Sequence, residues 1–391
     1  MNKLNYFDVI IVYSEAITKS VFDTSSNNQT PFLLGSDNEF YNTVYGYFLE
    51  VCQRMNLKVA FATSADIVGA GYCHGYWIFK NKKWLKKNSF CFSRLIFDKF
   101  SPTNNKIKSR RQLLFSSPKI KPFNNPNLFK LFFDKQKTYD KLSKYAIPTI
   151  SLDKISLNNI KQTCKKLTNL VNNFTGAKDF NSDIIMKDRF GAGGNHVYKF
   201  KANNAKKMLT VMEKNPSVSF IIQPFAKFDK GFSYHNHFAS TDIRFIYLKN
   251  KIILSYVRIA KNKDFRCNAH QGGTTVYLSF KTIPSALIMK ANLISKILNQ
   301  STSLYSLDFI ISNNGNSYLL EGNTGPGLNW DPFLIEDKIK SKKLIRLVVK
   351  ELSLRVKKQI STHYLPSTLI TKSIVNYPNY TDNFTNTLLN N

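Results

Sequence analysis

Acidic residues are scarce in this chain of 391 residues, which has 25 Asp and Glu against 56 Lys and Arg and a formal net charge of +31. Cysteine is also rare: the five thiols are odd in number, scattered, and include no Cys-x-x-Cys pair. Such spacing argues against a disulfide framework or a zinc site and favours a reducing, cytoplasmic compartment. The apolar run Val9–Val12 is too short for a signal segment or a membrane span. We therefore expect a soluble protein without a membrane partner.

The positive charge has two explanations. Lysines and arginines gathered on one surface would bind nucleic acid by releasing counterions from its phosphates. Here lysines occur in every segment, and the local runs at Lys80–Lys87 and Lys338–Lys343 do not form one long stripe. Compositional bias with a general attraction for anionic substrates is the favoured interpretation. A nucleic-acid partner stays open as the alternative.

The first third of the chain has the pattern of a β-α-β unit. A strand is predicted at Asp8–Tyr13, a helix at Glu39–Met55 and a second strand at Leu57–Thr63. The Ser-Pro, Lys-Pro and Asn-Pro steps between Ser117 and Pro126 mark a boundary loop. We therefore expect an N-terminal α/β domain over residues 1–127.

The remaining two thirds mix helices and strands, so the predicted fold class is α+β (mixed α/β). Helices are expected at 134–145, 157–174, 205–214, 285–300 and 338–359, and strands at 184–187, 196–201, 219–224, 243–248, 252–259 and 274–278. The predicted units are a central subdomain at 128–225, a C-terminal subdomain at 226–360 and a polar tail at 361–391.

The region from Asp308 to Gly327 reads as a β-hairpin, because two short apolar runs flank a turn rich in Asn and Gly. Glu321 and Asn323 are two residues apart, so a strand projects both to the same face. Together with Asp308 they bring two carboxylates and an amide oxygen to that face. Such oxygens suit a hard cation such as Mg²⁺, which usually also takes phosphate oxygens. The pattern predicts a metal site of a nucleotide enzyme.

A glycine-rich loop follows the strand that ends at Lys187, with Gly191, Gly193 and Gly194 before the chain returns as a strand. Glycines let backbone N–H groups approach phosphate oxygens, and the lysine adds a positive charge. The loop is neither a Walker motif nor a Rossmann fingerprint, because no Gly-Lys-Ser/Thr follows and no helix opens there. On its own, an ordinary flexible hairpin is the more common explanation.

Arginines recur in the next segment, at Arg244, Arg258 and Arg266, the last followed by Asn268. The first two lie within apolar alternation, where an unpaired buried charge would be costly. The alternative is a pair of surface arginines on the solvated face of an antiparallel sheet. Whether these arginines belong to a functional site depends on their order in the chain relative to the other motifs.

In that order the chain resembles the ATP-grasp superfamily, and within it the glutathione-synthetase-like and RimK-like carboxylate–amine ligases. The resemblance covers roughly residues 128 to 335. It is carried by Lys135, Lys187 with its Gly loop, Gln223-Pro224-Phe225, Asp242-Ile243-Arg244, Arg258, Arg266-x-Asn268 and Asp308 with Glu321-x-Asn323. The resemblance implies an ATP-grasp fold, in which two α+β subdomains clasp ATP, preceded by a small Rossmann-like pre-ATP-grasp domain.

The resemblance also implies roles for these residues. Lys135 and Lys187 would contact ATP, Gly191, Gly193 and Gly194 would close over its phosphates, and Gln223, Pro224 and Phe225 would read the adenine edge. Asp308, Glu321 and Asn323 would hold Mg²⁺ or Mn²⁺, Arg258, Arg266 and Asn268 would face the γ-phosphate and the carboxylate substrate, and Arg244 would orient substrate. One departure is Asp188, where many relatives have proline. An acid there is expected to point away from the phosphates or to pair with Arg189.

The implied reaction is ligation. A small-molecule or peptide carboxylate would be activated by ATP as an acyl phosphate, and an amine (an amino acid or a peptide) would then displace phosphate. The oligomeric state stays open, with a homo-oligomer as one alternative, because dimers and tetramers are common among such relatives. The alternatives are phosphotransfer, carboxylate–thiol ligation, or a non-catalytic basic protein that binds a nucleotide or a polyanion.

Overall fold

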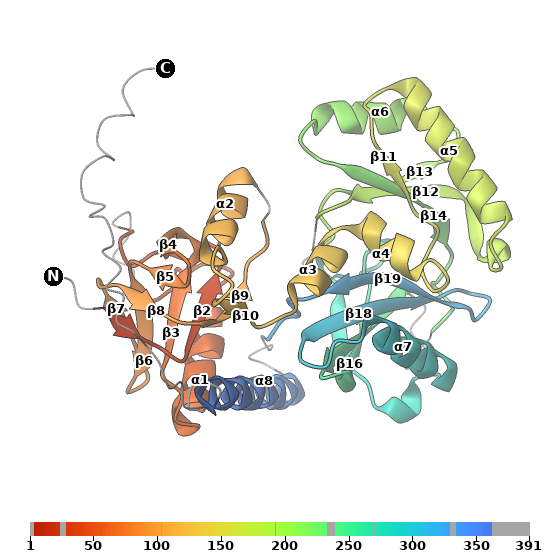
Figure 1. Ribbon diagram of the computed structural model, residues 1–391. Helices are drawn as coiled ribbons and strands as arrows, with labels where there is room; N and C mark the ends of the chain where they lie inside the picture. Colours follow the sequence, from red (N-terminus) through yellow and green to blue (C-terminus); the bar gives the residue numbers. More distant parts are fainter. Residues whose placement is uncertain are drawn as a thin grey trace, which may run out of the picture.

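The computed structural model describes residues 4–23, 29–102, 104–191, 193–232, 239–268, 271–328 and 334–361. It has the expected mixed α+β architecture, with an N-terminal unit on the left of Figure 1 and two sheet-containing lobes on the right. The predicted polar tail lies outside the described residues, apart from its first residue, Ser361, which ends the last helix. Among the described residues, no helix is both long and apolar enough to cross a membrane.

The N-terminal unit is built around a six-stranded sheet whose order is β10-β9-β2-β3-β6-β7. These strands are β10 (Lys121–Pro122), β9 (Leu95–Lys99), β2 (Val9–Tyr13), β3 (Val59–Thr63), β6 (Tyr76–Lys80) and β7 (Lys83–Lys87). The first four strands run parallel to one another, and β6 runs antiparallel to both of its neighbours, β3 and β7. Helix α1 (Tyr41–Arg54) connects β2 to β3, which confirms the expected β-α-β unit.

Strand β2 is buried on both faces, as is typical of a parallel sheet covered on either side. Val9 and Ile11 face one core and Ile10 and Val12 face another. The second core also takes in a small four-stranded sheet, β1-β8-β5-β4, and helix α2 (Asn105–Leu114). Its strands are β1 (Asn5–Tyr6), β8 (Cys91–Phe92), β5 (Tyr72–Cys73) and β4 (Ile67–Gly69).

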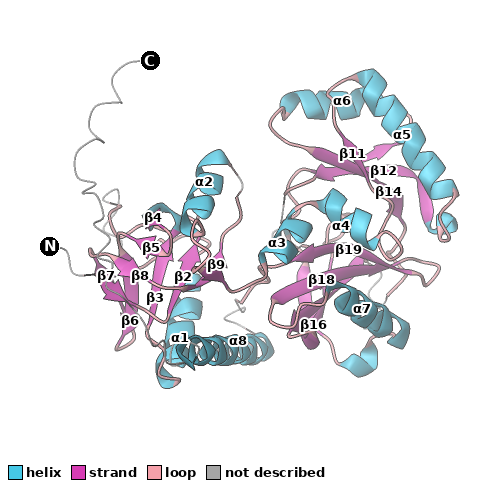
Figure 2. Ribbon diagram, viewed as in Figure 1, coloured by secondary structure: helices cyan, strands magenta, loops and turns pink. Residues whose placement is uncertain are grey.

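The upper lobe on the right contains a four-stranded antiparallel sheet of order β11-β14-β12-β13. Its strands are β11 (Ile150–Leu152), β14 (Phe220–Ala226), β12 (Phe180–Asp188) and β13 (Val197–Lys201). Helices α5 (Leu157–Asn172) and α6 (Ala205–Lys214) cover its outer face (Figure 2). Ile184 and Met186 point into that helical core. Because side chains alternate along a strand, Ile185 and Lys187 point to the opposite face.

The lower lobe contains a five-stranded antiparallel sheet of order β17-β16-β15-β18-β19. Its strands are β17 (Thr274–Tyr277), β16 (Lys251–Ile259), β15 (Thr241–Leu248), β18 (Leu304–Ile311) and β19 (Ser317–Asn323). One face packs its aromatic and aliphatic side chains against α7 (Ser285–Leu298). Helices α3 (Pro126–Phe133) and α4 (Lys135–Leu142) pack beside β19. The other face of this sheet carries the charged residues described below.

Helix α8 (Ile335–Ser361) joins the lower lobe to the N-terminal unit. It packs against α1, and its Ile345, Val348 and Leu352 are fully buried in a core that also holds Leu248 and Leu304 of the lower sheet. The N-terminal unit and the lower lobe therefore share one hydrophobic core. Three short 3₁₀ turns complete the described elements, at Ser64–Asp66, Ala177–Asp179 and Phe280–Thr282.

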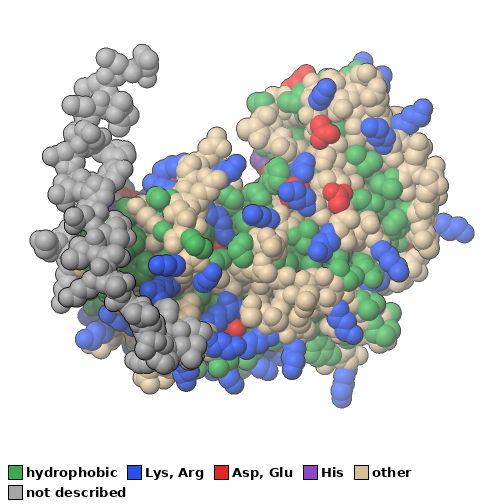
Figure 3. Space-filling view, in the orientation of Figure 1, with side chains coloured by type: hydrophobic (Ala, Val, Ile, Leu, Met, Phe, Trp, Pro, Cys, Tyr) green, Lys and Arg blue, Asp and Glu red, His purple; other side chains and the backbone are tan. Residues whose placement is uncertain are grey.

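Lysines and arginines are spread over both units on the face shown in Figure 3, with few acidic side chains among them. No single basic stripe stands out on that face.

Candidate active site

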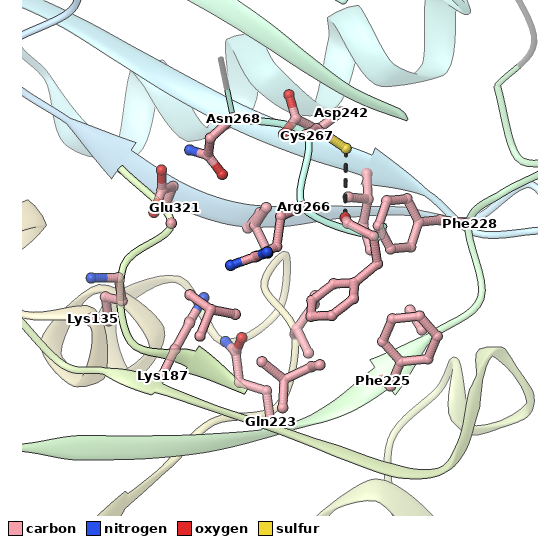
Figure 4. A pocket seen from close by; sticks show the side chains of 18 of the residues that line it. Lys135, Lys187, Gln223, Phe225, Phe228, Asp242, Arg266, Cys267, Asn268 and Glu321 are labelled. Carbon is pink, nitrogen blue, oxygen red and sulfur yellow. Dashed lines mark hydrogen bonds between the residues drawn. The ribbon is translucent and has the colours of Figure 1, made fainter. Parts of the chain in front are cut away.

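A cavity of about 850 Å³, open space at its mouth included, lies between the inner face of the upper sheet and the charged face of the lower sheet. Figure 4 shows Lys187 and Gln223 entering it from the strands of the upper lobe and Glu321 entering from the opposite side. Of the residues singled out from the sequence, those that line the cavity are Lys135, Lys187, Gly191, Gly194, Gln223, Pro224, Phe225, Arg258, Arg266, Asn268 and Glu321. Gly193, Arg244, Asp308 and Asn323 lie outside the lining.

Two lysines enter the cavity from different elements. Lys187 ends the buried part of β12 and is 6% exposed, and burial lowers its pKa to about 8 although the charge of Glu321 acts in the other direction. Lys135 is the first residue of α4, and its ammonium donates to the carbonyl oxygen of Gly191 in the glycine loop. Burial also lowers the pKa of Lys135. Two partly desolvated cations this close to each other favour an anionic ligand.

The glycine loop lies against the segment that follows Arg266. Gly193 and Gly194 have φ of +71° and +78°, a region that residues other than glycine seldom adopt. A Cβ on Gly194 would lie 2.9 Å from Cγ of Gln271 and 3.2 Å from Oδ1 of Asn268. The Gln271 amide donates to the Gly193 carbonyl oxygen at 3.3 Å. Glycine is therefore required both by the backbone conformation and by this close approach.

The expected pairing of Asp188 with Arg189 is wrong. Arg189 instead makes two hydrogen bonds of 2.7 Å to Asp134, the residue that caps α4 by accepting from the N–H groups of Gln136 and Lys137. Asp188 is among the residues that line the cavity, and its expected orientation away from bound phosphates stays a prediction. Its Oδ1 accepts from the backbone N–H of Phe190, which holds the carboxylate against the start of the loop.

An aromatic wall forms the other end of the cavity. Phe225 lies edge-to-face with Phe265 at a centroid distance of 5.7 Å and near Phe228 at 6.1 Å. The ammonium of Lys199 sits 3.5 Å from the centre of the Phe225 ring. Gln223, two residues before Phe225 on β14, donates to Thr149 Oγ1 at 2.8 Å. A flat, apolar wall beside fixed amide groups suits a planar heteroaromatic ligand.

Two arginines and two aspartates form a buried network across β15, β16 and β18, and two of them, Asp242 and Arg258, line the cavity. Arg258 donates to both carboxylate oxygens of Asp242, at 2.6 and 2.8 Å, and to Oδ2 of Asp308 at 2.7 Å. Arg244 makes two bonds of 2.6 and 2.5 Å to Asp308. Arg244 is 8% exposed and Arg258 is 5% exposed. The surface alternative for these arginines is therefore excluded.

The electrostatics of this network follow from burial and pairing. Burial raises the pKa of Asp308, but the charges of Arg244 and Arg258 outweigh burial and hold that pKa below its ordinary value. Burial raises the pKa of Asp242 to about 6, and the neighbouring Arg258 only partly offsets this rise. Arg258 is thus fixed from two sides before any ligand enters. A preorganised cation of this kind needs little reorganisation to stabilise negative charge.

The oxygens expected to bind a metal share one face of the hairpin. Asp308 pairs in register with Glu321, and Ser306 pairs with Asn323. Among the described residues, no group of three or more His, Cys, Asp or Glu side chains could hold a metal ion. Mg²⁺ needs no such group, because it is usually bound through one or two carboxylates plus phosphate oxygens and water. Glu321 and Asp308, with the Asn323 amide, provide a donor set of that kind and so fit the ion.

These three residues are not equivalent. Glu321 lines the cavity, and its side chain is 25% exposed. Asp308 is fully buried, and its two oxygens accept three hydrogen bonds from the arginines. A carboxylate has about four lone-pair sites, so roughly one remains for a metal. Asn323 Oδ1 accepts from the N–H of Gly325 at 2.7 Å. Glu321 is therefore the most accessible of the three.

Arg266 and Asn268 reach the cavity from the irregular segment after β16. Arg266 bonds Asp264 through Nε and Nη2, at 3.2 and 3.0 Å to the respective oxygens. The backbone carbonyl of Asn268 accepts from the N–H groups of Gln271 and Gly273. In the view of Figure 4 the Arg266 side chain lies between Asn268 and Gln223.

Sequence reasoning assigned no role to several residues of the cavity. Asp242, Phe228, Phe265 and Cys267 all line it. Cys267 packs among buried residues, and its Sγ lies 3.3 Å from the Ser240 carbonyl oxygen and 3.7 Å from that of Phe265 (Figure 4). Asp242 and Arg258 are register partners in the hairpin β15–β16, but a register shift between Ile246 and Tyr247 sets this pairing and the sequence did not reveal it. The two phenylalanines lie in loops and left no periodic signal.

Comparisons with known proteins agree with this geometry. Residues 132–347, more than half of the chain, match the model of the RimK-like ATP-grasp domain. A probable alpha-L-glutamate ligase of Legionella pneumophila (strain Corby) is 25% identical over 195 residues, which are 50% of this chain and 56% of the relative. One of Histophilus somni (strain 2336) is 29% identical over 149 residues, which are 38% of this chain and 44% of the relative. The chain spans about half the length of these curated relatives.

Solved structures resemble a larger part of the chain. D-cycloserine synthetase DcsG aligns with a TM-score of 0.54 and 11% identity, covering 90% of this chain and all of that one. A RiPP-associated ATP-grasp ligase of Chryseobacterium gregarium, in complex with ADP and a leader and core peptide, aligns with a TM-score of 0.51 and 12% identity, covering 89% and 97%. At such identities the likeness shows the fold alone, which is the ATP-grasp fold. The family model spans more than half of the chain and shows that the chain belongs to the RimK-like ATP-grasp family.

Proposed function

We propose that this protein is an ATP- and Mg²⁺-dependent ligase that activates a carboxylate as an acyl phosphate and joins it to an amine, releasing ADP and phosphate. The observation that carries the proposal is the composition of one cavity. It brings a buried lysine, a half-buried lysine, a preorganised arginine, an accessible glutamate and an aromatic wall to the same space. No covalent nucleophile is needed for this chemistry, because positioning and charge neutralisation do most of the work.

Adenine would lie against the aromatic end that Phe225 and Phe265 form, with the backbone of Gln223 to Phe225 beside it. The phosphates then extend towards Lys187, Lys135 and the glycine loop. Lys187 and Lys135 neutralise phosphate charge, and a bound anion raises the pKa of both ammonium groups. The loop around Gly193 and Gly194 excludes water, which protects an acyl phosphate from hydrolysis.

Mg²⁺ or Mn²⁺ would be held by Glu321, with Asp308 and Asn323 beside it. When bound, the ion would polarise phosphoryl oxygens and neutralise their charge. Arg244 and Arg258 fix the Asp308 carboxylate and so fix the metal-facing side of the hairpin. Arg258, Arg266 and Asn268 face the transferring phosphoryl group and the substrate carboxylate.

The two steps balance without a redox partner. A carboxylate oxygen of the acid substrate forms a bond to the γ-phosphorus while the bond to the β,γ-bridging oxygen breaks, and ADP leaves. The nitrogen of the amine then attacks the carbonyl carbon, phosphate leaves, and the amine loses a proton. Holding acid and phosphate together contributes on the order of 7–11 kcal/mol to lowering the first barrier. Amino acids and peptides are the proposed substrates, and L-glutamate is the first amine to test, given the names of the curated relatives.

The test is trapping with hydroxylamine. The protein is incubated with Mg-ATP, a panel of carboxylic acids and hydroxylamine, and ADP and hydroxamate are measured together. The proposal predicts equal amounts of ADP and hydroxamate for the true acid. ADP that appears with a stable phosphorylated product, and without hydroxamate, would indicate phosphotransfer instead. A chain that binds no ATP would favour a non-catalytic binding protein.

A further inference from the structure

The loop that follows Asn323 is held by side chains from the N-terminal unit. Asn124 Nδ2 donates to the carbonyl oxygen of Thr324 at 2.5 Å. Lys99 Nζ donates to the carbonyl oxygens of Gly325 at 3.2 Å and Pro326 at 2.8 Å. Three successive carbonyls are therefore bonded by two side chains that are about 200 residues away in the sequence. A loop held at three successive positions has little freedom to change conformation.

The held loop is coupled to the face expected to bind metal. The N–H of Gly325 donates to Asn323 Oδ1 at 2.7 Å, so the position of the Asn323 amide depends on the loop. Ser306, the register partner of Asn323, is fully buried, and among the described residues its hydroxyl has no hydrogen-bond partner. Buried hydroxyls are rarely left unpaired unless an ion, a water or a ligand completes them. The Ser306 hydroxyl is therefore an unpaired polar group on the strand position opposite Asn323.

Lys99 and Asn124 are well placed to hold this loop. Lys99 ends the parallel strand β9, and ligands of open α/β sheets bind beyond the carboxyl ends of such strands. Figure 1 shows β9 on the side of the N-terminal unit that faces α3 and β18. Asn124 is 8% exposed, and its Oδ1 accepts from the N–H of Leu304, the first residue of β18, at 2.8 Å. One side chain thus fastens both the start of β18 and the loop after β19.

The electrostatic setting of Lys99 supports a functional role. Among the described residues, no carboxylate lies within ion-pair distance of its ammonium, although Asp98 is its neighbour in sequence and pairs with Arg111. Burial, partly offset by the charge of Asp98, lowers the pKa of Lys99 to about 8. An ammonium that is only partly solvated and bonded to carbonyls alone is costly to keep, which is more common at functional sites than in plain cores.

We propose that Lys99 is a positioning residue of the active site: with Asn124 it fixes loop 324–326, and through that loop it sets the Asn323 amide for metal binding. The metal half of this inference rests on the proposed function, whereas the holding of the loop does not. The N-terminal unit is then a structural part of the catalytic centre.

Backbone amide exchange of the full chain, without ligand, tests the holding of the loop. Lys99→Met removes the donor and keeps the length of the side chain. We expect exchange at Gly325 and Gly327 to accelerate by about ten-fold or more, with exchange elsewhere unchanged. Lys99→Arg should restore part of the protection. The control Lys108→Met changes an exposed lysine of α2 in the same unit and should match the parent. Asn124→Asp keeps the acceptor for Leu304 and removes only the donor to Thr324, so it should accelerate exchange in the same segment.

Metal binding in the presence of ADP tests the coupling to Asn323. We expect Lys99→Met to weaken Mn²⁺ binding by about five-fold or more in spin-resonance titrations, while ADP affinity without metal stays within about two-fold. Unchanged exchange in both Lys99→Met and Asn124→Asp would overturn the inference. Accelerated exchange with unchanged Mn²⁺ affinity would overturn the coupling to the metal. If the parent chain binds no ADP, the proposed function fails, and the exchange result decides the holding of the loop by itself.

Discussion

At the scale of single residues, burial separates the roles of the acids on the hairpin. Asp308 is sealed under Arg244 and Arg258, whereas Glu321 opens to the cavity. Removing one member of a buried ion-pair network leaves an uncompensated charge and destabilises the fold. Changing the accessible acid should affect chemistry with much less effect on stability. Glu321 is therefore the better residue for testing the metal assignment.

Glu321→Gln should lower kcat by roughly 10²–10³-fold, because one charged group that neutralises phosphoryl oxygens is lost. The unfolding transition should stay close to that of the parent. Steady-state ADP release and thermal unfolding measure the two effects. Glu336→Gln serves as the control, because Glu336 lies at the exposed start of α8, and its side chain is 64% exposed. Retained turnover in Glu321→Gln would remove this residue from the metal site.

The pKa of Lys187 predicts proton uptake on binding ATP. Burial lowers this pKa from 10.5 to about 8, so above pH 8 the ammonium of the free protein loses its proton. Phosphates placed beside it raise the pKa again, so binding near pH 8.5 must take up a fraction of a proton. Calorimetry in buffers of different ionisation enthalpy measures that fraction. Lys187→Met should reduce the uptake, and equal uptake in both proteins would contradict the assignment.

The same pKa fixes the sign of a stability effect. The folded-state pKa lies below the unfolded one, so between pH 8 and 10.5 the unfolded chain binds more protons than the folded chain. The contribution of Lys187 is therefore unfavourable at neutral pH and is relieved as pH rises through that window. Lys187→Met lacks this titrating group, so the difference in unfolding free energy, parent minus variant, should itself rise with pH across that window.

At the scale of elements, periodic patterns in the sequence predicted the helices and strands well but did not predict which side chains pair with each other. The strands of the lower sheet and helices α5, α6, α7 and α8 lie close to their expected ranges, because each has a long apolar repeat. Helix α2 had no predicted counterpart, because most of its surface is polar and only Ile107 and Leu114 are buried. The partner of Arg189 was missed because Asp134 is 55 residues away in the sequence. Lys99 left no signal, because its partners lie in a loop more than 200 residues away.

Alanine substitutions at two glycines can separate the effect of backbone strain from the effect of a steric contact in the glycine loop. Gly194 and Gly315 both have positive φ, but a Cβ on Gly315 meets nothing within 4 Å. Alanine at either position should cost on the order of 1–2 kcal/mol in backbone strain. Only Gly194→Ala should also weaken ATP binding, by about ten-fold, because its Cβ would press on Gln271 and Asn268. Equal ATP affinity in the two variants, measured by calorimetry, would show that the loop does not close over the nucleotide.

At the scale of the whole molecule, α8 makes the N-terminal unit and the lower lobe one cooperative body. Its apolar side chains fill a core shared by both. The sequence predicted this helix but not its place, because the same amphipathic repeat could have packed on either unit alone. The designation of residues 1–127 as a pre-ATP-grasp domain stays a prediction.

Leu352→Ala should destabilise both units together by about 2–5 kcal/mol, because it empties a fully buried position in the shared core. Denaturant unfolding followed by tryptophan fluorescence should detect it, since Trp77 and Trp84 lie in that core. Leu354→Ala is the matched control, at a residue that is 40% exposed on the same helix. Loss of structure in the N-terminal unit alone would argue against a shared core.

The acyl phosphate is the central claim, and the fate of the carboxylate oxygen tests it most directly. The acid that gives a hydroxamate is labelled with ¹⁸O in its carboxylate and incubated with Mg-ATP and the amine. Attack of that oxygen on the γ-phosphorus, followed by displacement at carbon, must leave one labelled oxygen in the released phosphate. Mass spectrometry of the phosphate should therefore show one ¹⁸O for each amide formed. Amide formation with unlabelled phosphate would contradict the account.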